Sequence, residues 1–287
     1  MKKIKELSKK YDCFVNTQES NLKNLNLKNI PFKLKYINAM LPESAEWYKS
    51  EIADLDNRIF GPKGMFSPPW IDITFSGMAG AAIGLKEKDG QVVTIARFCG
   101  SLENDKMQLW TLLTYPKVQG KGLGTVTLAL FSALNQKKKK FQYITQIENP
   151  ALRLYMKLIS PDNPLRLTGI GFYHSQMPNS IAITSKIPKN PFDVLVNGIK
   201  APEEIRQGTG VEKLDGNEIP LNQVLFLPEK SKHNKIISDD ILKGASYDVI
   251  WWLSDKDSKE FDLVGPHLVI KKTGSISPLS HNGKLIG

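Results

Sequence analysis

Strand-like alternation of apolar and polar residues dominates the middle of the chain. The stretch GAAIGLKEKDGQVVTIARFCG (80–100) alternates on both sides of an Asp-Gly pair, which predicts a β-hairpin. KMQLWTLLTY (106–115) continues the pattern as a third strand. Similar runs predict four more strands, at 32–39, at 141–147 and as a closing pair within 167–187.

Helical spacing of apolar residues appears at three places between these strands. The predicted helices cover residues 42–59, 123–136 and 150–159, and two of them have proline near the first turn. The resulting order, β-α-ββ-β-α-β-α-ββ, predicts an α/β protein with a mixed sheet. It does not match a series of simple βαβ units.

The pattern changes after residue 187. Short apolar runs separated by turns predict strands and turns at NPFDVLVNGIKAPEE (190–204), around the Asp-Gly pair at 215–216, at YDVIWWLSD (247–255) and at FDLVGPHLVIKK (261–272). The sequence therefore divides into a basic N-terminal segment (1–30), an α/β domain (31–187) and a β-rich C-terminal extension or small domain (188–287).

Positive charge is concentrated near the N-terminus. The formal net charge is +10, and residues 1–35 contain nine lysines against three acidic residues. Such a segment is either a basic arm that meets nucleic acid or an anionic surface, or a frayed and solvated terminus. No Arg and few aromatic residues lie between these lysines. We therefore favour the frayed terminus and keep nucleic acid as the less favoured partner.

Cysteine, histidine and hydropathy patterns exclude several classes of protein. Cys13 and Cys99 cannot form a disulfide framework, and neither they nor the four histidines have metal-ligand spacing. No apolar run approaches the ~20 residues that span a bilayer. The basic start lacks the apolar core of a signal peptide. These features predict a cytoplasmic protein without a metal.

Three glycines lie within five positions of YPKVQGKGLGT (115–125), between a predicted strand and a predicted helix. Two phosphate-binding patterns fail there. A P-loop needs Lys after its last glycine, but Gly124 is followed by Thr125. A dinucleotide fingerprint that begins at Gly120 and Gly122 needs a third glycine where Thr125 stands.

A third pattern, Q-x-x-G-x-G, is met in full by Gln119, Gly122 and Gly124. With a strand before it and a helix after it, the segment from about 80 to 160 resembles the GNAT family of acetyl-CoA-dependent N-acetyltransferases, in which this motif binds pyrophosphate. Unpaired amides at a helix N-terminus attract an anion, and glycine lets it approach closely. The resemblance implies a GNAT-like fold with acetyl-CoA as co-substrate. It implies acetyl-CoA contacts at Leu112, Leu113, Thr114, Val118, Gln119, Gly120, Lys121, Gly122, Leu123, Gly124 and Thr125.

The segment ENPALRLYMKL (148–158) resembles the N-x-x-A-x-x-L-Y-x-K-L-G-F segment of the same family. Glu148 stands at the family's Asn position, and Ile159-Ser160 replaces the Gly-Phe that should follow. In many members the tyrosine at the position of Tyr155 protonates the departing CoA thiolate, and a phenol with a pKa of about 10 can donate a proton at neutral pH. The alternative is that Tyr155 is a core aromatic residue.

The resemblance also implies direct attack of a neutral amine on the thioester, with a backbone N–H of the preceding strand polarising the carbonyl. The family's strand glutamate falls on Lys106 in one alignment and on Tyr143 in another, so neither supplies a carboxylate. Glu148, which ends a strand expected to flank the acyl site, is better placed as a catalytic acid or base than Glu103 or Asp105.

We therefore expect an N-acetyltransferase for a protein amine or a small-molecule amine, and the net charge disfavours polycationic acceptors. The alternative is a GNAT-fold binding module for a protein or nucleic acid, which the missing strand glutamate favours and the intact motif disfavours. The loop 60–70 is expected to help shape the acceptor site. In the extension, adjacent Trp251 and Trp252 must face opposite ways on a strand. Either one is buried and the other exposed, or both are buried at a sheet edge.

Overall fold

The computed structural model describes residues 2–17, 26, 28, 30–38, 42–61, 80–88, 90–100, 106–137, 140–160, 162–171, 180–197, 200–211 and 218–275. The chain forms two compact units: unit 1 consists of Met1–Gln142 with Lys186–Gly198, and unit 2 of Tyr143–Ser185 with Ile199–Gly287. This division crosses the predicted α/β domain, because the strands near its end share a sheet with the last strands of the chain.

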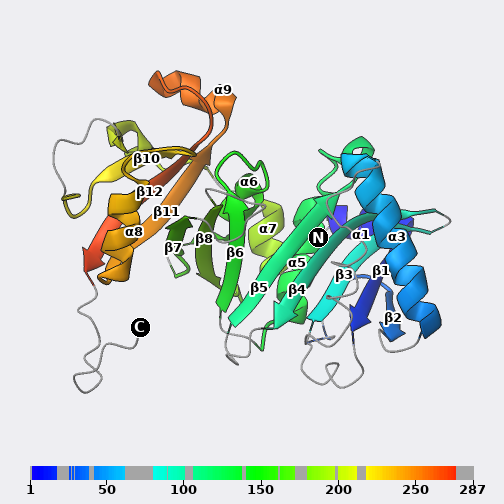
Figure 1. The fold of residues 1–287 in the computed structure, drawn as a ribbon. Helices are drawn as coiled ribbons and strands as arrows, with labels where there is room; N and C mark the ends of the chain where they lie inside the picture. The colour runs from blue at the N-terminus through cyan, green and yellow to red at the C-terminus, as the bar shows by residue number, and fades with distance from the viewer. Residues whose placement is uncertain are drawn as a thin grey trace, which may run out of the picture. The chain divides into compact units, whose positions relative to one another are not determined.

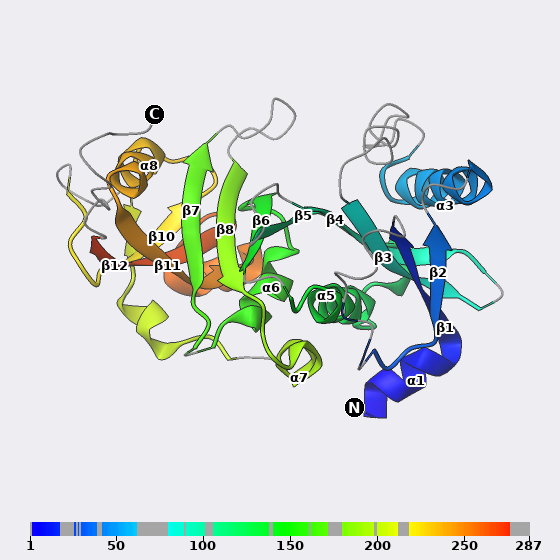
Figure 2. The same ribbon diagram turned by 90° about the horizontal axis from the view of Figure 1, so that it is seen from below.

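Unit 1 is a five-stranded mixed sheet with helices on both faces. Its elements are α1 (Lys2–Lys10), β1 (Tyr11–Thr17), β2 (Leu34–Asn38), α3 (Pro42–Phe60), β3 (Gly80–Glu87), β4 (Val92–Gly100), β5 (Lys106–Thr114), the 3₁₀ helix η1 (Pro116–Val118), α5 (Leu123–Leu134) and α7 (Pro191–Asn197). The strand order is β2-β1-β3-β4-β5, in which β1 runs parallel to β2 and the other neighbours are antiparallel. Figure 2 shows α3 on one side of this sheet and α5 on the other. The predicted hairpin, third strand and long helices are confirmed.

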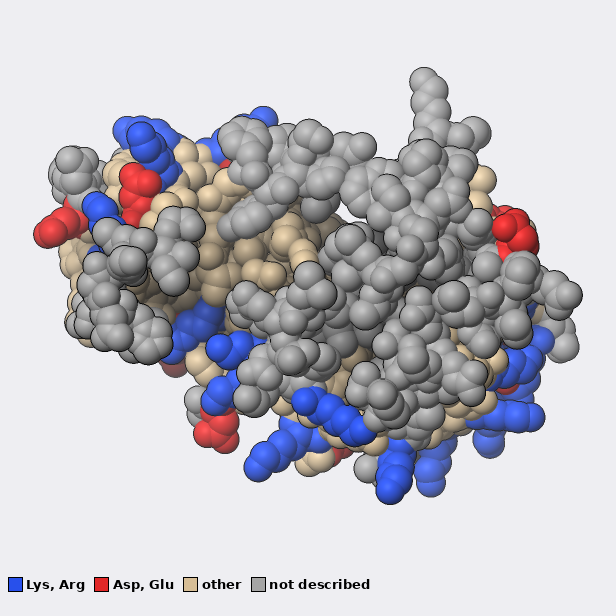
Figure 3. Space-filling model, turned by 60° about the horizontal axis from the view of Figure 1, so that its bottom comes forward, with Lys and Arg blue, Asp and Glu red and all other residues tan. Residues whose placement is uncertain are grey.

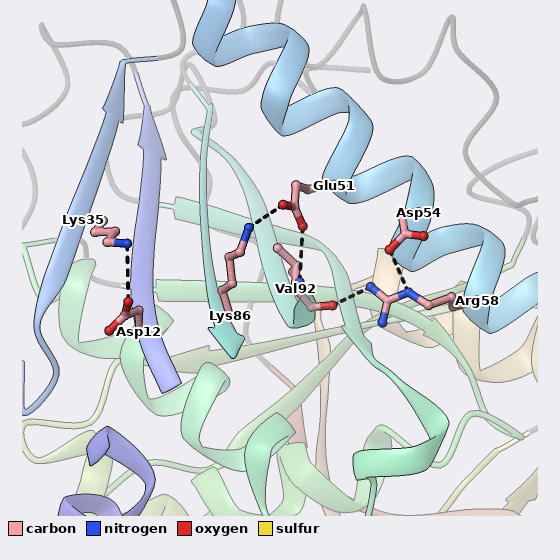
Figure 4. Close-up of polar contacts among 7 residues, drawn as sticks. All are labelled: Asp12, Lys35, Glu51, Asp54, Arg58, Lys86 and Val92. Atoms are coloured by element: carbon pink, nitrogen blue, oxygen red, sulfur yellow. Dashed lines mark hydrogen bonds and ion pairs between the residues drawn. The ribbon is translucent and has the colours of Figure 1, made fainter. Parts of the chain in front are cut away.

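Helix α3 is fixed to the start of β4 by two charged side chains (Figure 4). The backbone N–H of Val92 donates to Glu51 Oε2 at 3.3 Å, and Arg58 Nη2 donates to the carbonyl oxygen of Val92 at 2.7 Å. Glu51 also pairs with Lys86, and Arg58 Nε pairs with Asp54 at 2.8 Å. Beneath these contacts lies a buried cluster of Phe14, Ile52, Leu55, Ala82, Val92, Ile95 and Leu113.

The expectation of a frayed N-terminus is wrong for residues 2–17. β1 lies between β2 and β3, and residues 13–17 are all buried. Ile4 of α1 is also buried, and Asp12 pairs with Lys35 at 3.4 Å. The sequence did not indicate this because both neighbours of β1 are distant along the chain, so the pairing has no local signal.

Helix α5 is buried on all sides: every residue from Leu123 to Leu134 except Gly124 is buried. Such a helix needs cover on the side away from the sheet. Helix α7 supplies it, with Pro191 and Leu195 buried. The prediction of only strands and turns over 190–204 is therefore wrong, although proline at the first helical position and Asp193 in the first turn are ordinary helix-start signals.

Unit 2 is a second mixed sheet region, drawn from green to red in Figure 1. Its elements are β6 (Lys140–Gln146, which begins in unit 1), α6 (Leu152–Tyr155), η2 (Met156–Leu158), β7 (Leu165–Gly171), β8 (Ser180–Lys186), η3 (Glu203–Gln207), β9 (Thr209–Gly210), β10 (Val224–Pro228), α8 (Asn234–Leu242), β11 (Ala245–Leu253), α9 (Asp255–Ser258), η5 (Lys259–Phe261) and β12 (His267–Ser275). The strand order is β6-β8-β7-β11-β12-β10-β9. The predicted closing pair is confirmed as the antiparallel β7 and β8, and the extension continues the sheet because β11 pairs with β7. Helix α8 was not predicted.

The adjacent tryptophans of β11 differ in environment. Trp252 is buried, and its Nε1 donates to the carbonyl oxygen of Ile147 at 2.7 Å. Trp251 is half-buried and packs against a cluster of Ile205, Val224, Phe226, Ile250, Leu253 and Val269. Trp252 thus attaches β11 of the extension to Ile147, the residue that follows β6.

Some predictions fall outside the described residues, namely the loop beyond Gly61 and the second Asp-Gly turn. Across the parts of the chain that are described, no helix combines the length and the apolar character needed to cross a membrane.

Candidate functional site

The glycine stretch forms a tight connection between β5 and α5. After η1, Gly120 has φ 76° and Gly122 has φ 86°, both in the left-handed region. A residue with a Cβ pays roughly 1–2 kcal/mol to adopt this conformation. A Cβ on Gly120 would meet no atom of the described part of the chain within 4 Å, so the backbone conformation, and not a close neighbour, favours glycine there.

The backbone N–H groups at the end of this connection, from Gly120 to Gly124, are not used within the described residues. The first hydrogen bond of α5 runs from the N–H of Val126 to the carbonyl oxygen of Gly122, at 3.0 Å. Within the described chain, the N–H groups of residues 120–124 have no hydrogen-bond acceptor. Lys117 and Lys121 beside them are exposed. Free amides at the positive end of a 12-residue helix, flanked by cations, form an environment that suits a phosphate or diphosphate.

Gln119 has a different contact from the one the motif suggests. Its Nε2 donates to the carbonyl oxygen of Thr114 at 3.0 Å, and this bond ties the glycine stretch to the last residue of β5. The side chain therefore positions the loop, and the free amides that follow it are the groups available to an anion.

The base of the connection is held from α3. The Arg58 guanidinium lies 4.6 Å from the centre of the Tyr115 ring, and the N–H of Tyr115 donates to the carbonyl oxygen of Val93 at 2.9 Å. Because Arg58 also binds Val92, one side chain joins α3, β4 and the start of the glycine stretch. No sequence motif indicated Arg58, since its partners come from three separate segments.

The other residues predicted to contact acetyl-CoA differ in how far their side chains are exposed. Leu113 points into the buried cluster of unit 1, so only its backbone is available to a ligand, whereas Leu112 and Thr114 are half-buried. Val118, Leu123 and Thr125 are buried and anchor the connection. The pairing of β4 with β5 skips Trp110, because Arg97 faces Thr111 and Phe98 faces Leu109. This β-bulge was not predicted, and it leaves one residue of β5 outside the ladder.

In unit 2, Tyr155 lies in the protein interior. Its exposed fraction is 5%, and its ring stacks on Tyr143 with centroids 4.4 Å apart. Burial raises the pKa of Tyr155, so the phenol is neutral at pH 7. Tyr143 is fully buried with its hydroxyl 3.4 Å from Ser185 Oγ, and burial raises its pKa as well. Tyr143, which one alignment places at the family's strand glutamate, is thus an aromatic residue of the core.

Glu148 is exposed in the turn after β6. The side chain of the next residue, Asn149, holds the turn before the short helix that carries Tyr155, because its Oδ1 accepts from the N–H of Ala151 at 2.9 Å. Glu229 directly follows β10, and partial burial together with the neighbouring carboxyl group of Glu148 raises its pKa. Sequence reasoning missed Glu229, since nothing near it in the chain resembles the motif.

Other candidates give less information. Glu103, Asp105 and His174 lie outside the described residues, as does the side chain of Lys106. Among the histidine, cysteine and acidic residues that are described, no group of three or more could hold a metal ion.

No family model matches the chain, and no curated protein matches it. Solved structures similar to it include nourseothricin acetyltransferase (14% identity, TM-score 0.33, 38% of this chain and 66% of that chain), a putative N-acetyltransferase from Lactobacillus plantarum (15%, 0.39, 52% and 94%) and a GNAT-family acetyltransferase from Streptococcus pneumoniae (16%, 0.37, 51% and 95%). The chain thus spans just under two thirds of the length of the first, at 66%. All three TM-scores are low, so we interpret the site from its own geometry.

Proposed function

We propose that this protein is an acyl-CoA-dependent N-acyltransferase that transfers the acetyl group of acetyl-CoA to an amine of a protein or a small molecule. One observation carries the proposal: the N–H groups of residues 120–124 have no acceptor within the described chain and stand at the start of a buried helix. The CoA pyrophosphate is the anion that the intact Q-x-x-G-x-G motif suggests.

Each part of the connection has a role in this proposal. The amides from Gly120 to Gly124 bind the pyrophosphate, and Gln119 holds them in place through Thr114. Lys117 and Lys121 add favourable charge. The half-buried Leu112 and Thr114 and the backbone of Leu113 line the pantetheine arm, and bound acetyl-CoA supplies the reactive thioester.

The chemistry requires two proton movements. The amine nitrogen loses a proton and forms a bond to the carbonyl carbon, while the carbon–sulfur bond breaks and the sulfur takes up a proton. Tyr155 is the proposed donor of the second proton, because burial keeps its phenol neutral. The raised pKa also makes Tyr155 a weaker acid than a thiol of pKa about 8.5, so the thiolate must be shielded from water to accept the proton.

Glu148 is the proposed acceptor of the first proton, directly or through water. Its carboxylate is exposed. Glu229 with its raised pKa supplies a neighbouring carboxyl group that can hold a proton.

A matched pair of glycine variants tests the cofactor claim. Gly120 and Gly61 have φ 76° and 79°, and a Cβ at either would meet no atom of the described residues within 4 Å. Gly120→Val and Gly61→Val should therefore cost similar stability, while only Gly120→Val lowers CoA affinity, by about tenfold or more. Calorimetric titration with CoA measures both. Equal CoA affinity in the two variants contradicts the assignment of the connection.

A second candidate, a CoA-binding module without chemistry, is favoured by the burial of Tyr143 and Tyr155. The two functions separate in an assay of thiol release from acetyl-CoA with a panel of amines and a proteome lysate. Thiol release that depends on an amine supports the transferase. CoA binding without release supports the module. If a CoA concentration about 100 times a micromolar Kd gives none of the expected ~2.7 kcal/mol of stabilisation, both are wrong.

A further inference from the structure

The whole formal charge of the protein resides in unit 1. Counted over their residues, unit 1 has 24 Lys and Arg against 14 Asp and Glu, and unit 2 has 15 against 15. The formal net charges are therefore +10 and zero. The sequence suggested that the surplus belonged to a loose terminus, but α1 is a folded helix that leads into a buried strand.

Three distant segments bring lysines together at the C-terminal end of α5. The N–H of Asn26 donates to the carbonyl oxygen of Leu134, and its Nδ2 donates to Gln136 Oε1, both at 2.7 Å. Gln136 Nε2 donates in turn to the carbonyl oxygen of Lys189, also at 2.7 Å. These bonds fix the backbone on which three exposed side chains stand: Lys28, Lys137 and Lys189.

Helix α1 lies on the same side of the sheet as α5 (Figure 2) and carries further lysines. Lys5, Lys9 and Lys10 are exposed, while Ile4 is buried and Leu7 is half-buried. Together with the three at the end of α5, we call these residues the lysine surface: Lys5, Lys9, Lys10, Lys28, Lys137 and Lys189. Figure 3 shows blue side chains along the lower edge of the molecule with few red ones between them. Glu6 and Asp193 are exposed acids on the helices that carry or adjoin this surface.

We propose that the lysine surface binds the phosphate backbone of double-stranded nucleic acid without reading its base sequence. Exposed lysines on a fixed backbone neutralise phosphates and release counterions. Among the described residues, Lys5, Lys9, Lys10, Lys28 and Lys189 form no ion pair with an acid of the protein. Their charges therefore remain available to an external polyanion.

Two features select a duplex over other anionic partners. A helix that lies on a membrane buries an apolar face in it, but the apolar residues of α1 pack against the protein. Single strands are held by stacking on exposed aromatic residues. The only large exposed aromatics in the described part of unit 1 are Tyr36 and Phe60, and neither belongs to α1 or to the end of α5.

The lysine surface is separate from the glycine connection. Its Lys28, Lys137 and Lys189 lie at the opposite end of α5 from the glycine connection, and α5 has 12 residues and therefore a length of about 18 Å. The binding of a duplex thus goes beyond the proposed acyl transfer and can be tested without it.

The test compares two quadruple variants of the full chain. Lys5, Lys9, Lys28 and Lys189 are changed to Gln in one, and the exposed Lys232, Lys235, Lys243 and Lys256 of unit 2 in the other, so that both lose the same charge. Fluorescence anisotropy measures binding to DNA and RNA duplexes of about 20 base pairs over a range of salt. The backbone bonds of Lys28 and Lys189 do not depend on their side chains, so the fold should persist.

For the wild type we expect log Kobs to fall with log salt at a slope of about −4 to −5, if the five lysines without an ion pair in the described chain meet phosphates. The unit 1 variant should reduce that slope by about 3 to 4, and the unit 2 variant should leave it unchanged. A Lys→Arg version of the unit 1 variant keeps the charge and should restore binding, which separates loss of charge from loss of fold. A difference between the DNA and RNA arms tells which duplex is bound.

Three results would overturn the proposal. One is no binding of either duplex by the wild type at about 50 mM salt and ~100 µM protein. Another is equal weakening in both quadruple variants. The third is binding to phosphatidylserine vesicles, lost in the unit 1 variant, when neither duplex binds, because the partner is then a membrane surface. CoA affinity should be unchanged in every variant, so failure here is distinct from failure of the proposed acyl transfer.

Discussion

The two units use their charges in opposite ways. In unit 2 three cations of β7 and β12 are paired within the fold: Arg166 with Asp248 at 3.0 Å, Lys271 with Glu204 at 2.8 Å and Lys272 with Asp240 at 2.9 Å. In unit 1 the paired cations lie mainly where α3 meets the sheet, and many lysines remain on the surface. These three cations of unit 2 therefore support its fold, whereas the exposed lysines of unit 1 carry its surplus charge.

The long helices α5 of unit 1 and α8 of unit 2 differ in burial. Helix α5 is buried along almost its whole length, whereas Ile237 is the one buried residue of α8. A helix enclosed in this way cannot shift without disturbing the core around it. The glycine connection at its N-terminus and the lysines at its C-terminus are therefore both held on a rigid element.

The largest expected effect concerns this difference in burial. Phe131 of α5 is fully buried with its ring centroid 4.9 Å from that of Phe141, whereas Leu242 of α8 is 83% exposed. Phe131→Ala should lower the free energy of unfolding by about 3–5 kcal/mol because it leaves a cavity. Leu242→Ala should change it by less than about 0.5 kcal/mol. Urea unfolding measures both, and similar losses would remove the contrast between the helices.

The next effect concerns the stacked tyrosines of unit 2. Tyr155→Phe keeps the stack on Tyr143 and removes only the hydroxyl. If Tyr155 protonates the leaving thiolate, turnover should fall by about 100-fold while CoA affinity, assigned to unit 1, stays constant. Steady-state kinetics and CoA titration measure the two quantities. Tyr143→Phe is the matched control, and it should leave turnover unchanged because that hydroxyl faces Ser185.

Unchanged turnover in Tyr155→Phe would assign Tyr155 to the core alone. An equal fall in both tyrosine variants would show that the packing of the stacked pair matters and that proton donation by Tyr155 does not explain the loss.

The smallest effect concerns the internal ion pairs of unit 2. Burial alone raises the pKa of Asp240, but hydrogen bonds from Lys272 and Tyr247 and the charges of Lys272 and Lys243 outweigh it and lower the pKa. Its stabilisation is therefore present above the unfolded Asp pKa of about 3.9 and is lost as the pH falls through the lower folded value. Asp240→Asn should cost less than about 1 kcal/mol at neutral pH.

Urea unfolding of wild type and Asp240→Asn between neutral pH and about pH 3 tests this assignment. The difference in their free energies of unfolding should shrink as Asp240 becomes protonated at low pH. A difference that stays constant with pH would mean that the Asp240 charge does not stabilise unit 2.

Local signals predicted a large part of the fold. The hairpin of β3 and β4, the strand before the glycines and the helix after them were confirmed, because each depends on residues close together in sequence. Helix α7 was missed although Pro191 and Asp193 mark its start. Helix α8 was missed because one fully buried residue, Ile237, gives little periodic signal.

The sequence alone determined that the connection after β5 needs glycine and that a helix follows it, since backbone conformation and helix initiation depend on neighbouring residues. Only the tertiary structure decided that β1 lies inside the sheet, that Glu229 meets Glu148 and that Lys28, Lys137 and Lys189 gather at one end of α5. These arrangements bring together segments distant in the chain. Their stability comes from pairing and burial between those segments, which leave no periodic pattern in either one.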